Sequence, residues 1–442
     1  MPHNAKKLTT DAYKGVRDFL PADMAIQKAI FSLWRGICEK YGYEEYGSSV
    51  LEPADLYRAK TGEEIINEQT YTFTDRGDRE VTLRPEMTPT AARMVAGRRR
   101  DLIFPLRWYS IPNLFRYEQP QRGRLREHWQ LNVDIFGVEG AAAEIEIINM
   151  AFDITRAYGL KDTNFEIRLN NRKLMNYITK DVFSLSEELS RKVAKLIDRK
   201  DKLDAQSFNA ALSELFAPDP HLRGKDEQLL TLLNSGNFEE FISHLPQTAQ
   251  EHAGLKEIRE VISGLERLGI TNVRFDQTLM RGFDYYTGTV FEVFDLNPAN
   301  RRSVFGGGRY DELLSLFGND KVAAFGFGAG DVIARDLMET YGTLPKPESP
   351  ADVCICIVGD QNMPYSLDLA QKLRSEGVRV AVDFSGKKVG DQIANADKRG
   401  IKFMVAIGDQ EVTSGSFKLK NLKTKEEKVV DEDGLISEIR RP

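Results

Sequence analysis

The sequence has little cysteine and no long run of apolar residues. Its 442 residues include three cysteines, Cys38, Cys354 and Cys356, an odd number without paired spacing. Thiols of this kind are typical of a reducing compartment, so we expect a cytoplasmic protein. No apolar stretch approaches the ~18–20 residues that span a membrane, and the opening "MPHNAKKLTT" lacks the hydrophobic segment of a secretion signal. The sequence therefore predicts no membrane partner.

Histidine and net positive charge are also scarce. The five histidines are scattered along the chain, so a metal site built from histidine is not expected. The formal net charge of −6 argues against a protein that binds nucleic acid through its total charge. Basic residues nevertheless gather at 98–100 and 116–126. An acidic protein with such basic segments can still bind a polyanion at one defined place.

What the sequence contains is a change of pattern along its length. Apolar residues at helical spacing predict an amphipathic helix over 22–41. The segments "WYSIPNLFRYE" and "HWQLNVDIFGVE" predict an antiparallel hairpin whose tip, "QPQRGRLRE", is basic. Charged helices follow, strands return near Val273, and the prolines of "TLPKPESPAD" mark a linker. After the linker, strands and helices alternate as in a small, mostly parallel α/β domain.

These patterns predict the domain boundaries. Chain length alone allows two or three domains of roughly 100–200 residues. One sheet-containing domain is expected at 1–174 and 269–342, interrupted by a helical insertion at 175–268. A linker at 343–350 precedes the α/β domain at 351–442. The expected fold class is α+β for the first domain and α/β for the second.

The predicted hairpin carries polar groups in rows. In "QLNVDIFG", Gln130, Asn132 and Asp134 alternate with apolar residues, so one face of the strand is polar. Arg116 and Glu118 share a face of the preceding strand in the same way. Such faces often meet only water. The four arginines of this hairpin favour a triphosphate or a nucleic-acid backbone instead, because guanidinium groups match phosphate oxygens.

Three further segments combine charge or glycine with apolar surroundings. "LMRGFDYYTGTVFEVF" is apolar enough to be buried, yet it contains Arg281, Asp284 and Glu292. A buried charge is costly unless it is paired or meets a ligand, so we expect either an internal ion pair or a ligand site. "TLRPEMTPTAAR" places Glu86 and Thr88 between prolines, as in an ammonium site or an ordinary helix cap. "FGGGRYDEL" allows a flat ligand to approach the backbone, whereas "GFGAGD" lacks the spacing of a dinucleotide fingerprint.

Taken together, these motifs resemble one family. "FRYEQPQRGRLREHWQLNVDIFG" resembles the second signature motif of class II aminoacyl-tRNA synthetases. "RGFDYYTGTVFE" and "FGGGRYD" resemble the two signatures of the histidyl-tRNA synthetases, and "KGVRDFLP" and "LRPEMTPTAAR" match the same family. The resemblance covers nearly the whole chain: catalytic core, helical insertion and a C-terminal domain that resembles an anticodon-binding domain.

The resemblance implies a fold and a reaction. The fold is an antiparallel sheet of six or seven strands flanked by helices, in a homodimer with the helix from Ala22 at the subunit interface. The reaction joins L-histidine and ATP into histidyl-adenylate and then moves the histidyl group to the 3′ end of tRNA(His). Mg²⁺ is expected with ATP because of the triphosphate chemistry, and the sequence shows no cluster of metal ligands.

The resemblance also implies roles in catalysis and ATP binding. Arg116 and Arg281 match the catalytic arginines, which supply positive charge where negative charge builds up at phosphorus. ATP is expected to contact Arg116, Glu118 and Arg124, with Glu118 facing adenine. Arg335 is a further candidate for the ATP site.

The histidine site follows from the same resemblance. The residues expected to bind histidine are Glu86, Met87, Thr88, Gln130, Asp134, Arg281, Tyr285, Tyr286 and Tyr310. Among them, Asp134 and Tyr286 match the residues that hold the imidazole ring. Glu86, Thr88 and Gln130 match those that hold the α-ammonium group, and the glycine run beside Tyr310 forms a wall of the pocket.

The third motif of the family departs from its usual form in this chain. Where the family has "G-L-E-R", with an arginine stacked against ATP, this sequence has Asp331, Val332 and Ile333 after the glycine. Arg335 comes two positions late, a rotation of about 200° along a helix. Arg335 therefore either reaches ATP through a shifted helix or points away, and Arg126 is an alternative stacking partner.

Two functions other than a ligase are compatible with parts of the sequence. One is the catalytically silent paralogue that serves as a regulatory subunit in histidine biosynthesis. That paralogue lacks the C-terminal domain, whereas this chain continues for about 90 residues of α/β pattern after its linker. The other is a module that only senses tRNA, which would be expected to lose Arg116 or Arg281.

Overall fold

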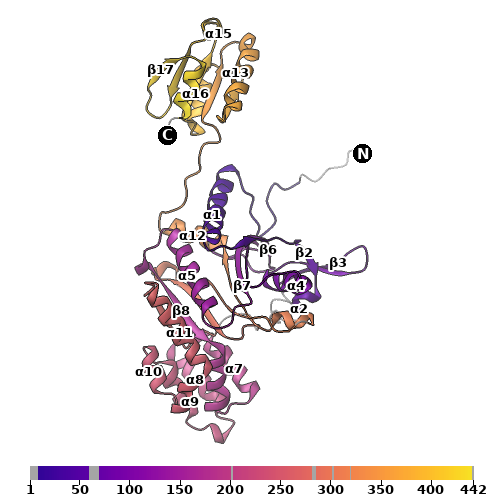
Figure 1. Cartoon of the computed structure of the whole chain (residues 1–442), viewed down its shortest axis with the longest axis vertical. Coiled ribbons are helices and arrows are strands. Elements are labelled where there is room, and N and C mark those ends of the chain that lie inside the picture. The colour runs from indigo at the N-terminus through magenta and orange to yellow at the C-terminus, as the bar shows by residue number, and fades with distance from the viewer. Residues whose placement is uncertain are drawn as a thin grey trace. The chain divides into compact units, whose positions relative to one another are not determined.

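The computed structural model describes residues 8–58, 69–200, 203–280, 285–300, 303–318 and 320–440. The chain divides into two units, Met1–Pro345 and Lys346–Pro442, within the proline-rich segment (Figure 1). Each unit has its own sheet and its own apolar core, so each is described by itself. None of the described helices combines the length and the apolar character needed to cross a membrane.

A mixed sheet of nine strands forms the centre of the first unit, and most of its pairs are antiparallel. Its strands are β1 (Glu44–Glu45), β5 (Leu106–Ser110), β6 (Asn113–Phe115), β7 (Glu127–Phe136), β8 (Phe165–Asn171), β9 (Val273–Phe275), β10 (Thr289–Asp295), β11 (Ser303–Arg309) and β12 (Ala324–Gly330). The order is β1-β5-β7-β12-β11-β10-β8-β9, and β6 pairs with β7. The expected antiparallel sheet is confirmed, with more strands than expected because β1 and β9 add short parallel edges.

The predicted hairpin is present at the middle of this sheet. β5 and β6 pair antiparallel with successive parts of β7, and the basic tip joins β6 to β7. β12 pairs with the other edge of β7 along nearly its whole length. The polar row of β7 therefore lies between two strands.

Three helices pack together against the sheet: α1 (Pro21–Lys40), α5 (Ala142–Ala157) and α12 (Asp331–Thr340). In α1, Ile30, Trp34 and Ile37 are buried at intervals of three or four residues, which produces one apolar stripe. Trp34 also donates a hydrogen bond from Nε1 to the Tyr158 hydroxyl at 2.7 Å. The predicted helix over 22–41 is confirmed.

A second, small sheet lies between α1 and the hairpin in sequence. Its strands are β2 (Leu51–Pro53), β3 (Tyr71–Thr74) and β4 (Glu80–Leu83), in the order β2-β4-β3, with α2 (Asp55–Arg58) after β2 and α4 (Thr88–Arg98) after β4. Pro89 occupies the first turn of α4, where its missing N–H costs no hydrogen bond. This helix start fixes the loop that contains Glu86.

Helices fill the region between β8 and β9. They are α6 (Arg172–Tyr177), α7 (Glu187–Ile197), α8 (Ala205–Phe216), α9 (Lys225–Leu233), α10 (Phe238–Ser243) and α11 (Ala253–Arg267). Ser186, Asp204 and Asn237 cap three of them by accepting a backbone N–H. Figure 1 shows α7 to α10 grouped together, whereas α11 packs on α5 and β8 of the sheet region.

The second unit contains a five-stranded sheet in the order β14-β13-β15-β16-β17. Its elements are β13 (Val353–Ile357), α13 (Met363–Ser375), β14 (Val380–Asp383), α14 (Val389–Lys398), β15 (Phe403–Ile407), α15 (Asp409–Ser414), β16 (Phe417–Asn421), β17 (Glu427–Val430) and α16 (Glu432–Arg440). The predicted alternation from β13 to β15 is confirmed as parallel pairs. The expectation of a mostly parallel sheet is wrong for its last part, because β16 and β17 add antiparallel pairs. Lysine residues interrupt the apolar positions of β16, and β17 is mostly exposed, so these short strands lack the continuous apolar character of β13 and β15.

Candidate functional site

A cavity of about 70 Å³ lies where β7, β11 and β12 meet the loop before α4. It is lined by Glu86, Thr88, Gln130, Asn132, Tyr285, Tyr286, Gly306, Tyr310, Gly326, Phe327 and Gly328. These residues come from distant parts of the sequence, and most of the residues expected to bind histidine are among them. Arg281 lies outside the described residues.

The polar row of β7 faces glycines of β12. Asp134 stands opposite Gly326, and Gln130 stands opposite Gly330, with Gly328 between those two glycines. A Cβ atom at Gly326 would overlap Oδ1 of Asp134, and one at Gly328 would lie 2.8 Å from the Gln130 side chain. The glycines thus leave room for the polar side chains. Sequence reasoning missed this role, although glycine at every second position of "GFGAGD" was its signal.

Asp134 is buried at the end of this row. Its Oδ1 accepts a hydrogen bond from the Tyr310 hydroxyl, and its Oδ2 has no hydrogen-bond partner within the described part of the chain. Burial raises the pKa of Asp134 to about 7, and the Tyr310 hydroxyl opposes that rise. A buried carboxyl with one oxygen unsatisfied can accept a hydrogen bond from a ligand N–H.

Glu86 lines the cavity from the loop before α4. The Tyr285 hydroxyl donates to its Oε2 at 3.0 Å. The Tyr57 hydroxyl lies 3.4 Å from the backbone carbonyl of Glu86 and 3.0 Å from the Thr90 hydroxyl. Burial and the Glu86 charge raise the pKa of Tyr285, which therefore stays a donor. Glu86 can bind a cation in this position.

Met87, also expected to contact histidine, lies differently from its neighbours. It is fully buried, and its Sδ lies 3.8 Å from the Ser48 hydroxyl. Glu86 and Thr88, on either side of it, both line the cavity. Met87 thus supports the loop from the core side.

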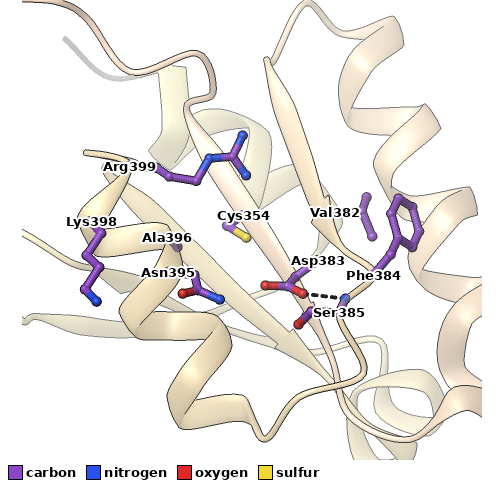
Figure 2. Close-up of a pocket in the computed structure, with 9 residues that line it drawn as sticks. All are labelled: Cys354, Val382, Asp383, Phe384, Ser385, Asn395, Ala396, Lys398 and Arg399. Carbon is purple, nitrogen blue, oxygen red and sulfur yellow. Dashed lines mark hydrogen bonds between the residues drawn. The ribbon is translucent and has the colours of Figure 1, made fainter. Parts of the chain in front are cut away.

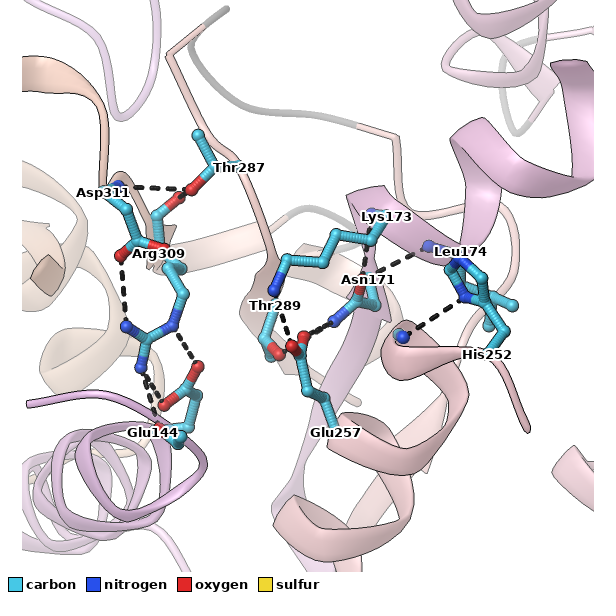
Figure 3. Close-up of polar contacts among 12 residues, drawn as sticks. Glu144, Asn171, Lys173, Leu174, His252, Glu257, Thr287, Thr289, Arg309 and Asp311 are labelled. Carbon is cyan, nitrogen blue, oxygen red and sulfur yellow. Dashed lines mark hydrogen bonds and ion pairs between the residues drawn. The ribbon is translucent and has the colours of Figure 1, made fainter. Parts of the chain in front are cut away.

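Arg309, next to Tyr310 in sequence, forms a buried ion pair with Glu144 (Figure 3). Arg309 donates to both carboxylate oxygens of Glu144 at 2.6 and 2.5 Å, and to Asp311 at 3.1 Å. The Thr287 N–H donates to the Arg309 carbonyl at 2.7 Å, and the Thr287 hydroxyl accepts from the Asp311 N–H. These hydrogen bonds connect Thr287, which follows Tyr286, with Arg309 and Asp311, which flank Tyr310. Sequence reasoning missed Arg309, although it lies within the quoted "FGGGRYD" motif.

Figure 3 shows a second polar cluster, which connects α11 to the sheet. Asn171, at the end of β8, donates to Glu257 of α11 at 2.8 Å and to the Thr289 hydroxyl at 3.2 Å. Lys173 contacts the same carboxylate at 2.5 Å. The strands β8 and β10 are therefore tied to the helical region by named side chains.

Of the predicted phosphate-binding residues, Arg116 lies beside the Glu86 loop. Arg116 donates from Nε to the Pro85 carbonyl at 2.8 Å, which places it next to the cavity. The exposed Arg124 lies 3.8 Å from Glu118. Arg126 donates to the Glu118 carbonyl at 3.1 Å, and its guanidinium stacks 4.0 Å from the Tyr117 ring centre. Within the described ranges, no group of three or more His, Cys, Asp or Glu residues is arranged to hold a metal ion.

Where this chain departs from the family's third motif, the structure has two arginine–aspartate pairs. Asp331, the first residue of α12, accepts from Arg17 at 2.6 Å and from the Trp129 N–H at 2.9 Å. Burial raises the pKa of Asp331, while Arg17 opposes the rise. Arg335 forms an ion pair with Asp23 of α1 at 2.8 Å. ATP binding by Arg335 remains a prediction. It requires the Arg335 side chain to break its ion pair with Asp23, or to contact ATP while that ion pair is kept.

The second unit has a cavity of about 420 Å³ beside β14 and α14 (Figure 2). It is lined by the basic side chains Lys398 and Arg399, by Asn395, and by the exposed ring of Phe384. A neighbouring cavity of about 350 Å³ includes Lys387 and Lys388 and shares Phe384 with the first. Asp383 lines both cavities and lies between Phe384 and the pair Lys398 and Arg399 in Figure 2. An exposed aromatic ring on a surface with basic groups can stack on a base.

The comparisons with known proteins cover both units. Residues 15–330 match the family model described as Histidyl-tRNA synthetase, and residues 352–441 match one described as Anticodon binding domain. A histidine--tRNA ligase of Leptospira biflexa is 40% identical over 422 residues, 95% of each chain. One of Thermoplasma volcanium is 35% identical, over 94% of this chain and 95% of that protein.

Solved structures agree with the sequence relatives. The histidyl-tRNA synthetase of Nostoc sp. PCC 7120 superposes with a TM-score of 0.82 at 25% identity and covers 98% of this chain and 100% of its own. A Bacillus halodurans protein titled as an ATP phosphoribosyltransferase regulatory subunit/histidyl-tRNA synthetase has a TM-score of 0.73 at 25% identity. That match covers 89% of this chain and 97% of the other.

Proposed function

The chain belongs to the histidyl-tRNA synthetase family, and we infer that it is a histidine--tRNA ligase: it activates histidine with ATP and transfers it to the 3′ end of tRNA(His). The observation that carries this function is the polar cavity within a chain that matches such ligases over nearly its full length. In the family that this chain resembles, the regulatory paralogue lacks the C-terminal domain. In this chain, residues 352–441 match an anticodon-binding domain.

The cavity is our proposed histidine site. Glu86, Thr88 and Gln130 would hold the α-ammonium group, because a carboxylate and two neutral acceptors suit a cation. Asp134, one strand away from the glycines, would accept the imidazole N–H through its unsatisfied oxygen. Tyr286 lines the same cavity and would pack beside the ring.

The proposed first step joins two anions. An oxygen of the histidine carboxylate attacks the α-phosphorus of ATP, and pyrophosphate leaves. Arg116, beside the Glu86 loop, and Arg281 would offset the charge that develops at phosphorus. Glu118 and Arg124 would contact adenine and the phosphates, and Mg²⁺ would enter with the triphosphate as part of the substrate.

In the proposed second step, a hydroxyl of the terminal ribose of tRNA(His) attacks the carbonyl carbon of the adenylate, and AMP leaves. The second unit would bind the anticodon region; the cavities around Phe384, Lys398 and Arg399 support this role. By family resemblance we also propose a homodimer with α1 at the interface, and a cytoplasmic location. The domain boundaries at 174, 268, 342 and 350 are proposed from the sequence patterns.

The decisive experiment is histidine-dependent exchange of labelled pyrophosphate into ATP, followed by charging of tRNA(His). We expect both reactions with the purified full chain. Exchange without charging would contradict the ligase assignment but leave the activation step intact. A lack of exchange with every amino acid would favour the regulatory or tRNA-sensing alternatives.

A further inference from the structure

Tyr46, Ser110 and Asp134 are neighbours on one face of the central sheet. Trp108, two residues before Ser110 on the same face of β5, stands opposite Asp134 in β7. Tyr46 directly follows β1, which pairs with β5, and its ring lies 5.3 Å from that of Trp108. Three adjacent strands thus bring two hydroxyl groups towards one carboxyl group.

Ser110 and Asp134 are buried and Tyr46 is partly buried, and each has a buried polar atom without a hydrogen bond. The atoms are the Tyr46 hydroxyl, Oγ of Ser110 and Oδ2 of Asp134, which find no partner within the described ranges of the chain. Burial and the Asp134 charge raise the pKa of Tyr46, and the Ser110 hydroxyl opposes that rise. The strand pairings and the ring contact independently place the three groups on neighbouring segments of one face. Buried polar atoms are rarely unsatisfied, and a small polar pocket with two to four such atoms typically holds one water molecule.

We propose that Tyr46 and Ser110 together hold a water molecule against Asp134 and so fix the carboxyl group that selects histidine. They are positioning residues, because they act through Asp134 and the water. The proposal rests on the proposed function, in which Asp134 binds the imidazole ring. It goes further by assigning specificity to two residues that the motifs do not contain, one directly after β1 and one in β5.

The two sides of Asp134 support this arrangement. Tyr310, which lines the cavity, donates to Oδ1, so that oxygen is oriented from the cavity side. The described residues that line the cavity include Tyr310 and Gly326, which contact or face Asp134, but not Asp134 itself, Tyr46 or Ser110. The two hydroxyls therefore act on the carboxyl from beyond the cavity wall. Oδ2 has two lone pairs, so it can accept from this water with one and from the imidazole N–H with the other. A carboxyl anchored from both sides presents that second lone pair in one direction, which favours a planar N–H donor such as imidazole.

The test uses Tyr46→Phe and Ser110→Ala in the full-length enzyme, with L-histidine as the varied substrate in pyrophosphate exchange. Each variant should raise the histidine KM about 3- to 10-fold, the effect of one neutral hydrogen bond, without changing kcat or the ATP KM. Because both hydroxyls bind the same water, the double variant should be no worse than the poorer single variant. Independent effects would multiply instead.

Tyr109→Phe is the matched control. Tyr109 is a buried tyrosine of the same strand, but its side chain projects to the opposite face, where its hydroxyl meets Glu39 at 3.3 Å. We expect its histidine KM to equal that of the wild type. If Tyr46→Phe lowers the folded fraction in thermal melting, Ser110→Ala alone carries the test, because it removes a single oxygen atom.

The outcomes separate this proposal from the proposed function. Wild-type exchange with unchanged histidine KM in both single variants would overturn the positioning role and leave the ligase intact. Multiplying effects in the double variant would overturn the shared water. Absence of exchange in the wild type would overturn the proposed function itself.

Discussion

Burial alters the ionisation of Asp134, which lies against the cavity-lining residues Tyr310 and Gly326. Its pKa is about 7 in the folded chain because of burial, against about 4 for an exposed aspartate in an unfolded chain. Between these two values, the folded protein holds a proton that the unfolded chain has released. The free energy of unfolding contributed by Asp134 should therefore fall as the pH rises from about 4 to about 7.

Asp134→Asn tests this sign. The variant has no titrating group here, so between pH 5 and 7 the wild type should lose up to about 1.4 kcal/mol of stability per pH unit relative to it. Urea unfolding at several pH values measures the difference. Asp320→Asn serves as the control, because the Asp320 side chain is 96% exposed. Parallel stability curves for the wild type and Asp134→Asn would contradict the raised pKa.

The glycines of β12 give a second prediction at the residue scale. Gly326→Ala would push a methyl group into Asp134, whereas Gly330→Ala, on the same face of the same strand, meets no atom within 4 Å among the described residues. Gly326→Ala should therefore cost about 1–3 kcal/mol in stability and raise the histidine KM, while Gly330→Ala stays near the wild type. Chemical unfolding and pyrophosphate exchange measure both. Equal stability and equal histidine KM in the two variants would show that β12 shifts to accommodate the methyl group at position 326.

Among the elements, β11 and the segment before β10 depend on one buried ion pair. Arg309 and Glu144 have side chains that are 5% and 3% exposed, so removing one charge leaves the other buried without its partner. Glu144→Gln should lower the free energy of unfolding by about 3–5 kcal/mol. Glu312→Gln, which disturbs an exposed pair with Lys321, should cost less than about 1 kcal/mol.

Urea unfolding of both variants gives the comparison. A small loss of unfolding free energy in Glu144→Gln would mean that Asp311 and the backbone carbonyls around Arg309 are enough to stabilise the Arg309 charge. The histidine KM should also rise in Glu144→Gln, because the network holds Thr287 and hence the tyrosines before it.

The sequence predicted elements whose signals are local. Alternation in "QLNVDIFG" predicted the polar face of β7, and the residues around Glu86 predicted a loop before a helix. Contacts across the sheet were not predictable in this way. The fit of Gly326 to Asp134 depends on strand register, and Arg309 meets Glu144 across 165 positions of sequence. Patterns within one segment do not specify which distant segment it faces.

At the scale of the whole molecule, the two units divide the work in a testable way. A chain ending at Pro345 keeps the entire sheet of the first unit and every described residue of the proposed histidine site. It should still exchange pyrophosphate with histidine present, but charge tRNA(His) poorly because the proposed anticodon contacts are absent. Aminoacylation over a range of tRNA concentrations measures the loss. An unchanged KM for tRNA would remove the second unit from recognition.

Salt dependence provides the companion measurement. Binding of tRNA(His) by the full chain should weaken linearly with log salt, since phosphate contacts release counterions. The chain ending at Pro345 should show a shallower slope. Identical slopes would place the phosphate contacts in the first unit alone.

The pairing of β7 with β12 has a consequence for how the protein is made. β7 is synthesised early and β12 late, with the whole helical region between them. Until β12 leaves the ribosome, one edge of β7 has no strand to pair with, and exposed strand edges are sites of aggregation. The helices made in the interval have mostly local contacts and fold quickly. Ribosome-bound chains should therefore be most vulnerable to aggregation, and most dependent on chaperones, just before residue 324 emerges.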